Sequence, residues 1–132
     1  MARVIVFDAS VLIAHLDADD AQHARAEGLL ARELESEDFA VNPLTLSEIL
    51  VVPTREDRLD EVMSRLSDLE VQEIPFPNET ATALAQLRVS TRLRMPDCCV
   101  LLTARQTSAT VASFDDRLME AADRLGLGTV RT

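Results

Sequence analysis

Short apolar runs alternate with amphipathic segments along the whole chain, and this alternation constrains the fold more than any other feature. Residues 3–8 (RVIVFD) form an apolar, β-branched run that ends in an aspartate, and similar runs occupy 39–42, 71–76 and 109–113. Runs without polar alternation are typical of strands that are covered on both faces in a parallel sheet. Since segments with helical spacing lie between them, we expect an α/β fold with a mainly parallel sheet of four to five strands.

The segments between these runs carry the start and stop signals of helices. Helices are expected over 9–16, from Asp19 or Asp20 to about 35, from 43 to near Pro53, and over 56–66, 79–91, 97–106 and 115–125. Gly126 is expected to end the last helix, and a short strand is expected at 129–130. The 132 residues fit one domain, 1–132, which is large enough to bury a core without a metal or a disulfide.

The charge composition restricts the chemistry. The chain has 23 acidic residues and 13 lysines plus arginines, with a formal net charge of -10, so any contact with nucleic acid needs a local basic patch. None of the basic residues is a lysine, which excludes Schiff-base chemistry and a P-loop lysine. The chain has 4 phenylalanines and no tyrosine or tryptophan, which disfavours a base-stacking platform of several rings.

The sequence predicts a cytoplasmic protein that does not enter a membrane. No run reaches the roughly 20 apolar residues of a membrane helix. The amino terminus leads directly into the first strand, whereas a signal peptide needs a longer apolar stretch followed by a cleavage site.

Four carboxylates stand next to segments that favour burial. Asp8 and Asp115 follow the first and fourth expected strands, at the sheet edge where α/β proteins bind ligands. Glu48 lies in LTLSEILVV and Asp97 in MPDCCVLL. Each also has a purely structural interpretation, because Asp8 and Asp115 can cap helices, Asp97 suits a first turn, and Glu48 can pair with a buried arginine.

As a group, the four acids are harder to explain by structure alone. Two carboxylates within about 4 Å repel by roughly 4 kcal/mol at an effective dielectric of 20, and a divalent cation removes that repulsion. Oxygen ligands without cysteine or histidine favour Mg²⁺ or Mn²⁺. The adjacent Cys98 and Cys99 show no zinc signature and are expected to be buried.

Four segments together resemble the PIN-domain nucleases, and specifically the VapC toxins of bacterial toxin–antitoxin pairs. They are VIVFDASVLIAHL, PLTLSEIL, RMPDCCVLLTA and TVASFDDRL, in the family's order and approximate spacing. The resemblance implies one PIN domain over 1–132, a three-layer α/β/α fold, a homodimer, and inhibition by a cognate VapB-type antitoxin. It also implies an Mg²⁺- or Mn²⁺-dependent endoribonuclease that acts on transfer or ribosomal RNA and leaves a 5′-phosphate and a 3′-hydroxyl.

The family pattern assigns roles to individual residues. The acids that hold the metal and carry the catalysis match Asp8, Glu48, Asp97 and Asp115. The hydroxyl residues that support them match Ser10 and Ser113. The role of Asp116 stays open, because this residue either assists or replaces Asp115 at the metal or only begins the last helix.

Two further features have competing interpretations. The residues that could bind RNA phosphates are Arg88, Arg92, Arg94 and Arg117. Each of them can equally be a surface arginine that only pairs with a nearby acid. The apolar stretch 49–52 belongs either to a central core helix or to a contact surface for a second subunit or an antitoxin.

Other functions fit the chain less well. One alternative is an inactive PIN-fold module that only binds partners, but the presence of all four acids disfavours it. Another is a different metal-dependent phosphoesterase or a phosphate-accepting receiver domain. The absence of lysine disfavours the receiver, and Ser10 stands where a phosphatase of that type has a second aspartate.

Overall fold

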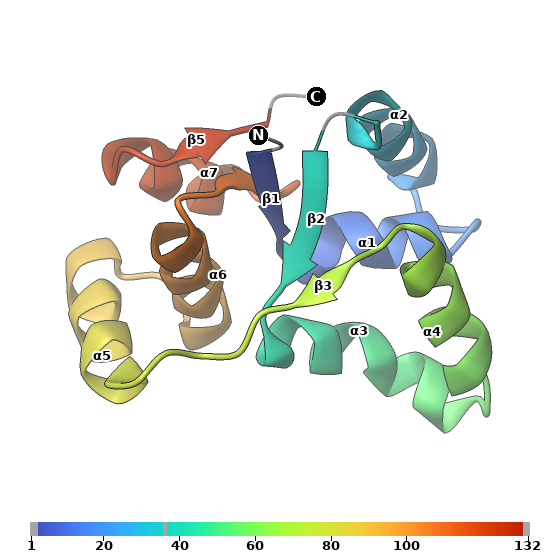
Figure 1. The fold of residues 1–132 in the computed structure, drawn as a ribbon, viewed down its shortest axis with the longest axis horizontal. Coiled ribbons are helices and arrows are strands. Elements are labelled where there is room, and N and C mark those ends of the chain that lie inside the picture. Colours follow the sequence, from blue (N-terminus) through green and yellow to red (C-terminus); the bar gives the residue numbers. More distant parts are fainter. Residues whose placement is uncertain (1–2, 36, 131–132) are drawn as a thin grey trace.

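A sheet of five parallel strands occupies the middle of the molecule. The computed structural model describes residues 3–35 and 37–130 (Figure 1). The strands are β1 (Arg3–Phe7), β2 (Glu37–Val41), β3 (Gln72–Glu73), β4 (Thr110–Ala112) and β5 (Gly128–Thr129). They lie side by side in the order β3-β2-β1-β4-β5, and every neighbouring pair is parallel. The expected parallel sheet of four to five strands is confirmed.

Helices cover both faces of the sheet. On one face lie α1 (Ala9–Leu16), α2 (His23–Glu33), α3 (Pro43–Arg55) and α4 (Leu59–Asp68), and on the other lie α5 (Thr80–Thr91), α6 (Met95–Thr107) and α7 (Asp116–Arg124). Neighbouring strand residues point to opposite sides, so that Phe7 packs on the first layer and Val6 on the second. The three-layer arrangement is therefore confirmed.

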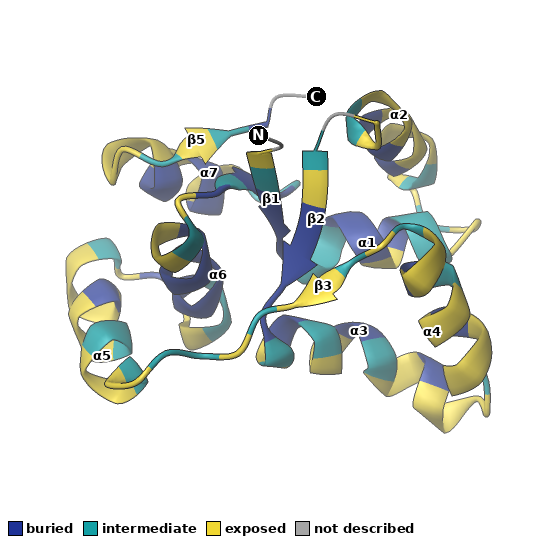
Figure 2. Ribbon diagram, in the orientation of Figure 1, coloured by how far each residue is buried: buried dark blue, intermediate teal, exposed yellow. Residues whose placement is uncertain are grey.

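The core explains why the strands read as uninterrupted apolar runs. The carboxyl-terminal halves of β1 and β2 are buried on both faces, as Figure 2 shows. Phe7 and Phe39 meet edge to face with their ring centroids 5.1 Å apart. Cys98 and Cys99 are buried free thiols in α6, as expected. No helix in the described part of the chain is long and apolar enough to cross a membrane.

Several element boundaries differ from the sequence-based expectation, among them the start of α2, which begins at His23 instead of directly after Asp19 or Asp20. Helix α3 continues through the buried Pro53 to Arg55, and the Glu56 N–H donates to the Val52 carbonyl at 3.0 Å to close the last turn beyond the proline. Strand β3 is confined to Gln72–Glu73 instead of covering 71–76. Pro75 and Pro77 lack the N–H group that a longer ladder needs.

The topology decides where a ligand can bind. The chain runs outward from β1 to β2 and β3 on one side and to β4 and β5 on the other, so the order reverses between β1 and β4. In sheets of this type the crevice at the carboxyl ends of the two strands flanking the reversal binds ligands. Residues directly after β1 and β4 therefore lie at the functional edge.

Candidate functional site

Asp8 follows β1 and is held by two serines. Its Oδ1 accepts hydrogen bonds from the Ser10 N–H at 3.1 Å and the Ser10 hydroxyl at 2.6 Å, which caps α1. Its Oδ2 accepts a hydrogen bond from the Ser113 hydroxyl at 2.5 Å. Asp8 is only 9% exposed, so these donors fix the orientation of a nearly buried carboxylate.

The same serines connect Asp8 to the segment after β4. The Asp115 N–H donates to the Ser113 hydroxyl at 2.8 Å, and the Phe114 N–H donates to the Ser10 hydroxyl at 3.1 Å. Asp115 caps α7, where its Oδ1 accepts a hydrogen bond from the Arg117 N–H at 2.9 Å. Asp8 and Asp115 are thus helix caps and also neighbours at one sheet edge.

Glu48 and Asp97 reach this edge from two different helices. Asn42 follows β2 and caps α3 by accepting a hydrogen bond from the Thr45 N–H at 2.8 Å, which sets the start of the helix that carries Glu48. Asp97 stands in the first turn of α6, directly after Pro96. Helices α3 and α6 belong to opposite layers and contact each other beside the sheet edge.

The pKa shifts of three of the acids record the charges of their neighbours. Burial raises the pKa of Asp8, and the charge of Asp115 raises it further against the hydrogen bonds from Ser10 and Ser113. Burial also raises the pKa of Glu48, with added repulsion from Asp8 and Asp97. The pKa of Asp97 is raised by burial first, and then by Asp115 and Asp8 against the charge of Arg94. The acids are thus linked in pairs, Asp8 with Asp115, Glu48 with Asp8 and Asp97, and Asp97 with Asp115 and Asp8.

This donor set fits a hard divalent cation. All four side chains offer carboxylate oxygens, and their mutual repulsion is what a shared cation relieves. Within residues 3–35 and 37–130, no three acidic, histidine or cysteine side chains are already close enough to share one ion. Binding therefore requires the side chains to turn toward one another, which is a small and fast motion for an exposed residue such as Glu48.

Three of the four predicted arginines border the acids. A cavity of about 180 Å³ is lined by Arg92, Leu93, Arg94, Asp97, Asp115 and Arg117. Arg94 lowers the pKa of both Glu48 and Asp97, and Arg117 also acts on Asp97, against the larger effect of burial. Arg88 is exposed on α5 and does not line this cavity. Asp116 is exposed as the first residue of α7, and it does not contribute to the shifted pKa values of the other acids.

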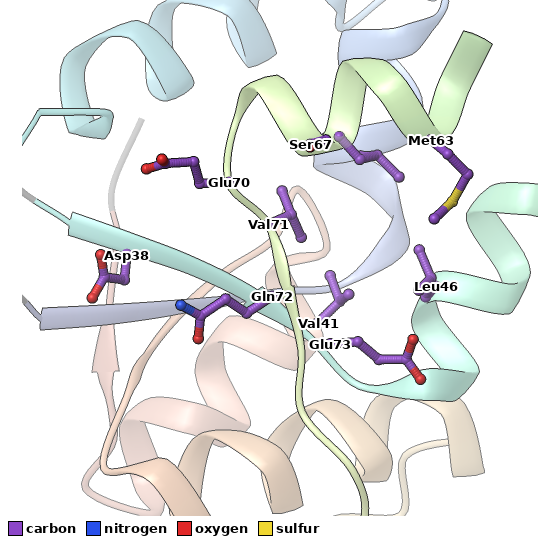
Figure 3. Close-up of a pocket in the computed structure, with 10 residues that line it drawn as sticks. Asp38, Val41, Leu46, Met63, Ser67, Glu70, Val71, Gln72 and Glu73 are labelled. Atoms are coloured by element: carbon purple, nitrogen blue, oxygen red, sulfur yellow. The ribbon is translucent and has the colours of Figure 1, made fainter. Parts of the chain in front are cut away.

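Two larger hollows lie on the α1–α4 side of the molecule. A groove of about 610 Å³ runs between α1, α3 and α4 and includes Glu48 at its margin. A second hollow of about 600 Å³ lies between α3, α4 and the strands β2 and β3, with acidic and apolar side chains in its lining (Figure 3). The second hollow contains none of the predicted site residues.

Sequence reasoning overlooked three residues beside the site. Asn42 before Pro43 is a recognisable helix start, so its capping role was accessible from the sequence. Its Nδ2 is a buried donor without a hydrogen-bond partner among the described residues. Phe114 lies under the guanidinium of Arg25 from α2, and no local pattern signals that contact, because the two residues are brought together by the fold.

Comparisons with known proteins agree with this fold. The PIN domain family model matches residues 5–124. A toxin–antitoxin complex from Klebsiella pneumoniae has a similar fold, with a TM-score of 0.71, 20% identity and coverage of 96% of both chains. FitAcB from Neisseria gonorrhoeae has a TM-score of 0.70, 22% identity and 96% coverage of both chains.

A third similar structure is the sarcin-ricin loop cleaving toxin VapC20 of Mycobacterium tuberculosis. Its TM-score is 0.67 at 17% identity, with coverage of 89% of this chain and 94% of that chain. No curated protein sequence matches the chain significantly. At these identities the structural likenesses establish the fold.

Proposed function

This chain belongs to the PIN-domain family, and from that premise we propose that it is a metal-dependent endoribonuclease, the toxin of a toxin–antitoxin pair. The observation that carries the proposal is the convergence of four carboxylates from four separate segments on the edge where the strand order reverses. The similar folds of toxin–antitoxin proteins support the biological role. The description of one of them as a sarcin-ricin loop cleaving toxin supports RNA, of the ribosomal or transfer class, as the substrate.

The acids have complementary tasks in the proposed reaction. Asp8, Glu48, Asp97 and Asp115 would hold Mg²⁺ or Mn²⁺, which when bound lowers the pKa of water and polarises a phosphate. Ser10 and Ser113 keep the Asp8 carboxylate oriented through their hydroxyl donors. Asp97 or Asp8 accepts the proton of the attacking water, a role that suits carboxylates whose pKa is raised. Water adds to phosphorus and the 3′ oxygen departs, leaving a 5′-phosphate and a 3′-hydroxyl.

RNA reaches this acidic protein through a local basic border. Arg92, Arg94 and Arg117 line the same cavity as Asp97 and Asp115, so that a phosphate at the carboxylates has arginines beside it. Their charges offset part of the repulsion that a net charge of -10 exerts on RNA. We assign Arg88 an outer position in the same border, since it lies on α5 one turn before Arg92.

Replacing Arg92 and Arg94 together with alanine is expected to weaken RNA binding at low salt. Each lost phosphate contact should also reduce the slope of log affinity against log salt, by about 1 per arginine. Filter binding of a labelled RNA at several salt concentrations measures both quantities. Arg105→Ala is the matched control, because Arg105 is exposed at the other end of α6 from Asp97. An unchanged slope in the double variant would assign both arginines to the surface only.

The groove between α1, α3 and α4 is the proposed binding site of a VapB-type antitoxin. Its apolar lining includes Ile13, Ile49 and Val52, and Glu48 at its margin places a bound segment next to the acids. Within the stretch 49–52, Ile49 is buried in the core, whereas Val51 and Val52 are half exposed, at 52% and 50%, so this part of α3 serves the core on one face and offers an apolar surface on the other. A second subunit is the alternative occupant of this surface, and the sedimentation coefficient of the purified chain measures directly whether it forms a homodimer.

Incubation of the purified chain with total RNA tests the proposed function. We expect endonucleolytic cuts in Mg²⁺ or Mn²⁺ and none in EDTA, because the four acids need a cation before they can act together on a phosphate. Mapping the 5′ ends of the fragments identifies the cut site and whether each end carries a phosphate. A protein that binds RNA or an antitoxin but never cuts RNA in either metal would be the inactive partner-binding module.

A further inference from the structure

Phe114 and Arg25 form a stack at the rim of the acidic site. Phe114 stands between Ser113 and Asp115 and is only partly buried. The guanidinium carbon of Arg25 lies 4.3 Å from the centroid of the Phe114 ring, within the range of a cation–π contact. Arg25 is exposed, so the stack is reached from solvent. An arginine stacked on an aromatic ring at a nuclease site presents a flat cationic surface.

Hydrogen bonds hold this stack at a defined place relative to the acids. The Phe114 N–H donates to the Ser10 hydroxyl at 3.1 Å, and that hydroxyl donates to Asp8 Oδ1 at 2.6 Å. The residues on either side of Phe114 contact the site directly, through the Ser113 hydroxyl on Asp8 and through Asp115. The backbone of Phe114 therefore has a fixed position relative to Asp8 and Asp115.

The position of Arg25 separates it from the arginines already assigned to RNA. Arg92, Arg94 and Arg117 belong to the layer of α5, α6 and α7, whereas Arg25 belongs to α2 in the opposite layer. An RNA strand whose phosphate is at the acids thus has the three arginines on one side and the Arg25–Phe114 stack on the other. With one side of its guanidinium over Phe114, Arg25 has its other side available to the π face of a nucleobase.

We propose that the Arg25–Phe114 stack binds an unpaired nucleobase of the RNA next to the phosphate that is cut. This inference rests on the proposed ribonuclease function and adds a base-recognising element to it. Stacking on the guanidinium tolerates any base and favours purines, whose larger rings cover more of the arginine. The substrate class is accordingly RNA with a single-stranded stretch at the cut site.

The test compares two oligoribonucleotides of equal charge, one of ten adenosines and one of ten abasic riboses. Binding is measured in the Asp8→Asn protein in Mg²⁺, which keeps the stack and slows cleavage, with and without a second change of Arg25→Lys. Lysine retains the charge and loses the flat guanidinium. We expect Arg25→Lys to weaken adenosine binding by about five- to tenfold and to leave abasic binding unchanged. Phe114→Leu should give the same selective loss.

Arg32→Lys, an exposed arginine on the same helix, is the matched control and should change neither affinity. If Arg25→Lys changes the affinities for both oligoribonucleotides equally, or changes neither, the stack has only a structural role and the proposal is overturned. Failure of the ribonuclease function looks different, because the natural sequence then neither cuts nor binds RNA of either kind, which overturns both proposals.

Discussion

An Asp8→Asn protein is expected to cut RNA at least roughly a hundredfold more slowly than the natural sequence in Mg²⁺, while keeping its fold. Asparagine removes one negative ligand and one candidate proton acceptor from the group of four acids. It retains an oxygen that caps α1, the local role in which Asp8 accepts a hydrogen bond from the Ser10 N–H. Single-turnover cleavage rates measure the effect, and Asp97→Asn should show a similar loss.

Asp60→Asn serves as the control for this pair of variants. Asp60 is an exposed acid in the first turn of α4, on a helix that contributes none of the four site acids, and the change also removes one negative charge. It should cut RNA at the natural rate. A natural rate in Asp8→Asn would exclude the carboxylate group as the catalytic centre, whatever the other variants do.

Asp8→Asn, which is expected to slow cleavage, is expected to stabilise the metal-free protein. Burial raises the pKa of Asp8 in the folded protein above its value in the unfolded chain. The contribution of Asp8 to the free energy of unfolding is therefore fully present below the unfolded pKa. It is lost as the pH rises through the folded pKa. Asparagine carries no charge at any pH. In EDTA the melting temperature of Asp8→Asn should therefore exceed that of the natural sequence at pH 7, and the difference should shrink toward pH 4.

Mn²⁺ is expected to raise the melting temperature of the natural sequence by several degrees. A ligand that binds only the folded state at about 100 times its dissociation constant stabilises that state by roughly 2.7 kcal/mol. For a chain of this length, each 1 kcal/mol corresponds to about 3–6 °C. Differential scanning calorimetry with Mn²⁺ or EDTA measures the shift without any need for cleavage.

The matched comparison is the Asp8→Asn/Asp97→Asn double variant, which should lose most of the shift. Its two missing charges weaken the cation site, while exposed acids elsewhere on the surface stay the same. Equal shifts in the double variant and the natural sequence would mean that Mn²⁺ binds other surface carboxylates, and the metal assignment would then be abandoned.

Much of the fold follows from local patterns. The run from Arg3 to Phe7 is recognisable as a buried parallel strand, because both of its faces pack against helices. The caps at Asp8 and Asp115 arise from hydrogen bonds within three residues, so the sequence is enough to anticipate them. The short β3 and the helix that continues past Pro53 were not anticipated, although Pro75 and Pro77 are local signals that limit β3.

The sequence could nominate the acids of the candidate site but not their arrangement. Carboxylates beside apolar segments singled out Asp8, Glu48, Asp97 and Asp115, and their roles remain a prediction; in the fold Asp8 is buried, Asp97 and Asp115 are partly buried, and Glu48 is exposed. The different positions of Arg88 and Arg92 were not predictable, although the two residues are one helical turn apart. Arg92 stands in a left-handed conformation after the end of α5 and lines the cavity, whereas Arg88 on α5 does not.

The sequence by itself determined the kinds of elements, the capping aspartates and the four acids set among apolar residues, because these depend on residues a few positions apart. Only the tertiary structure decided that β1 and β4 are neighbours, that α3 and α6 bring Glu48 and Asp97 to the same edge, and that Arg25 lies over Phe114. These contacts join segments far apart in the chain. They arise from strand order and layer packing, where burial of the whole core rather than any local pattern sets the free energy.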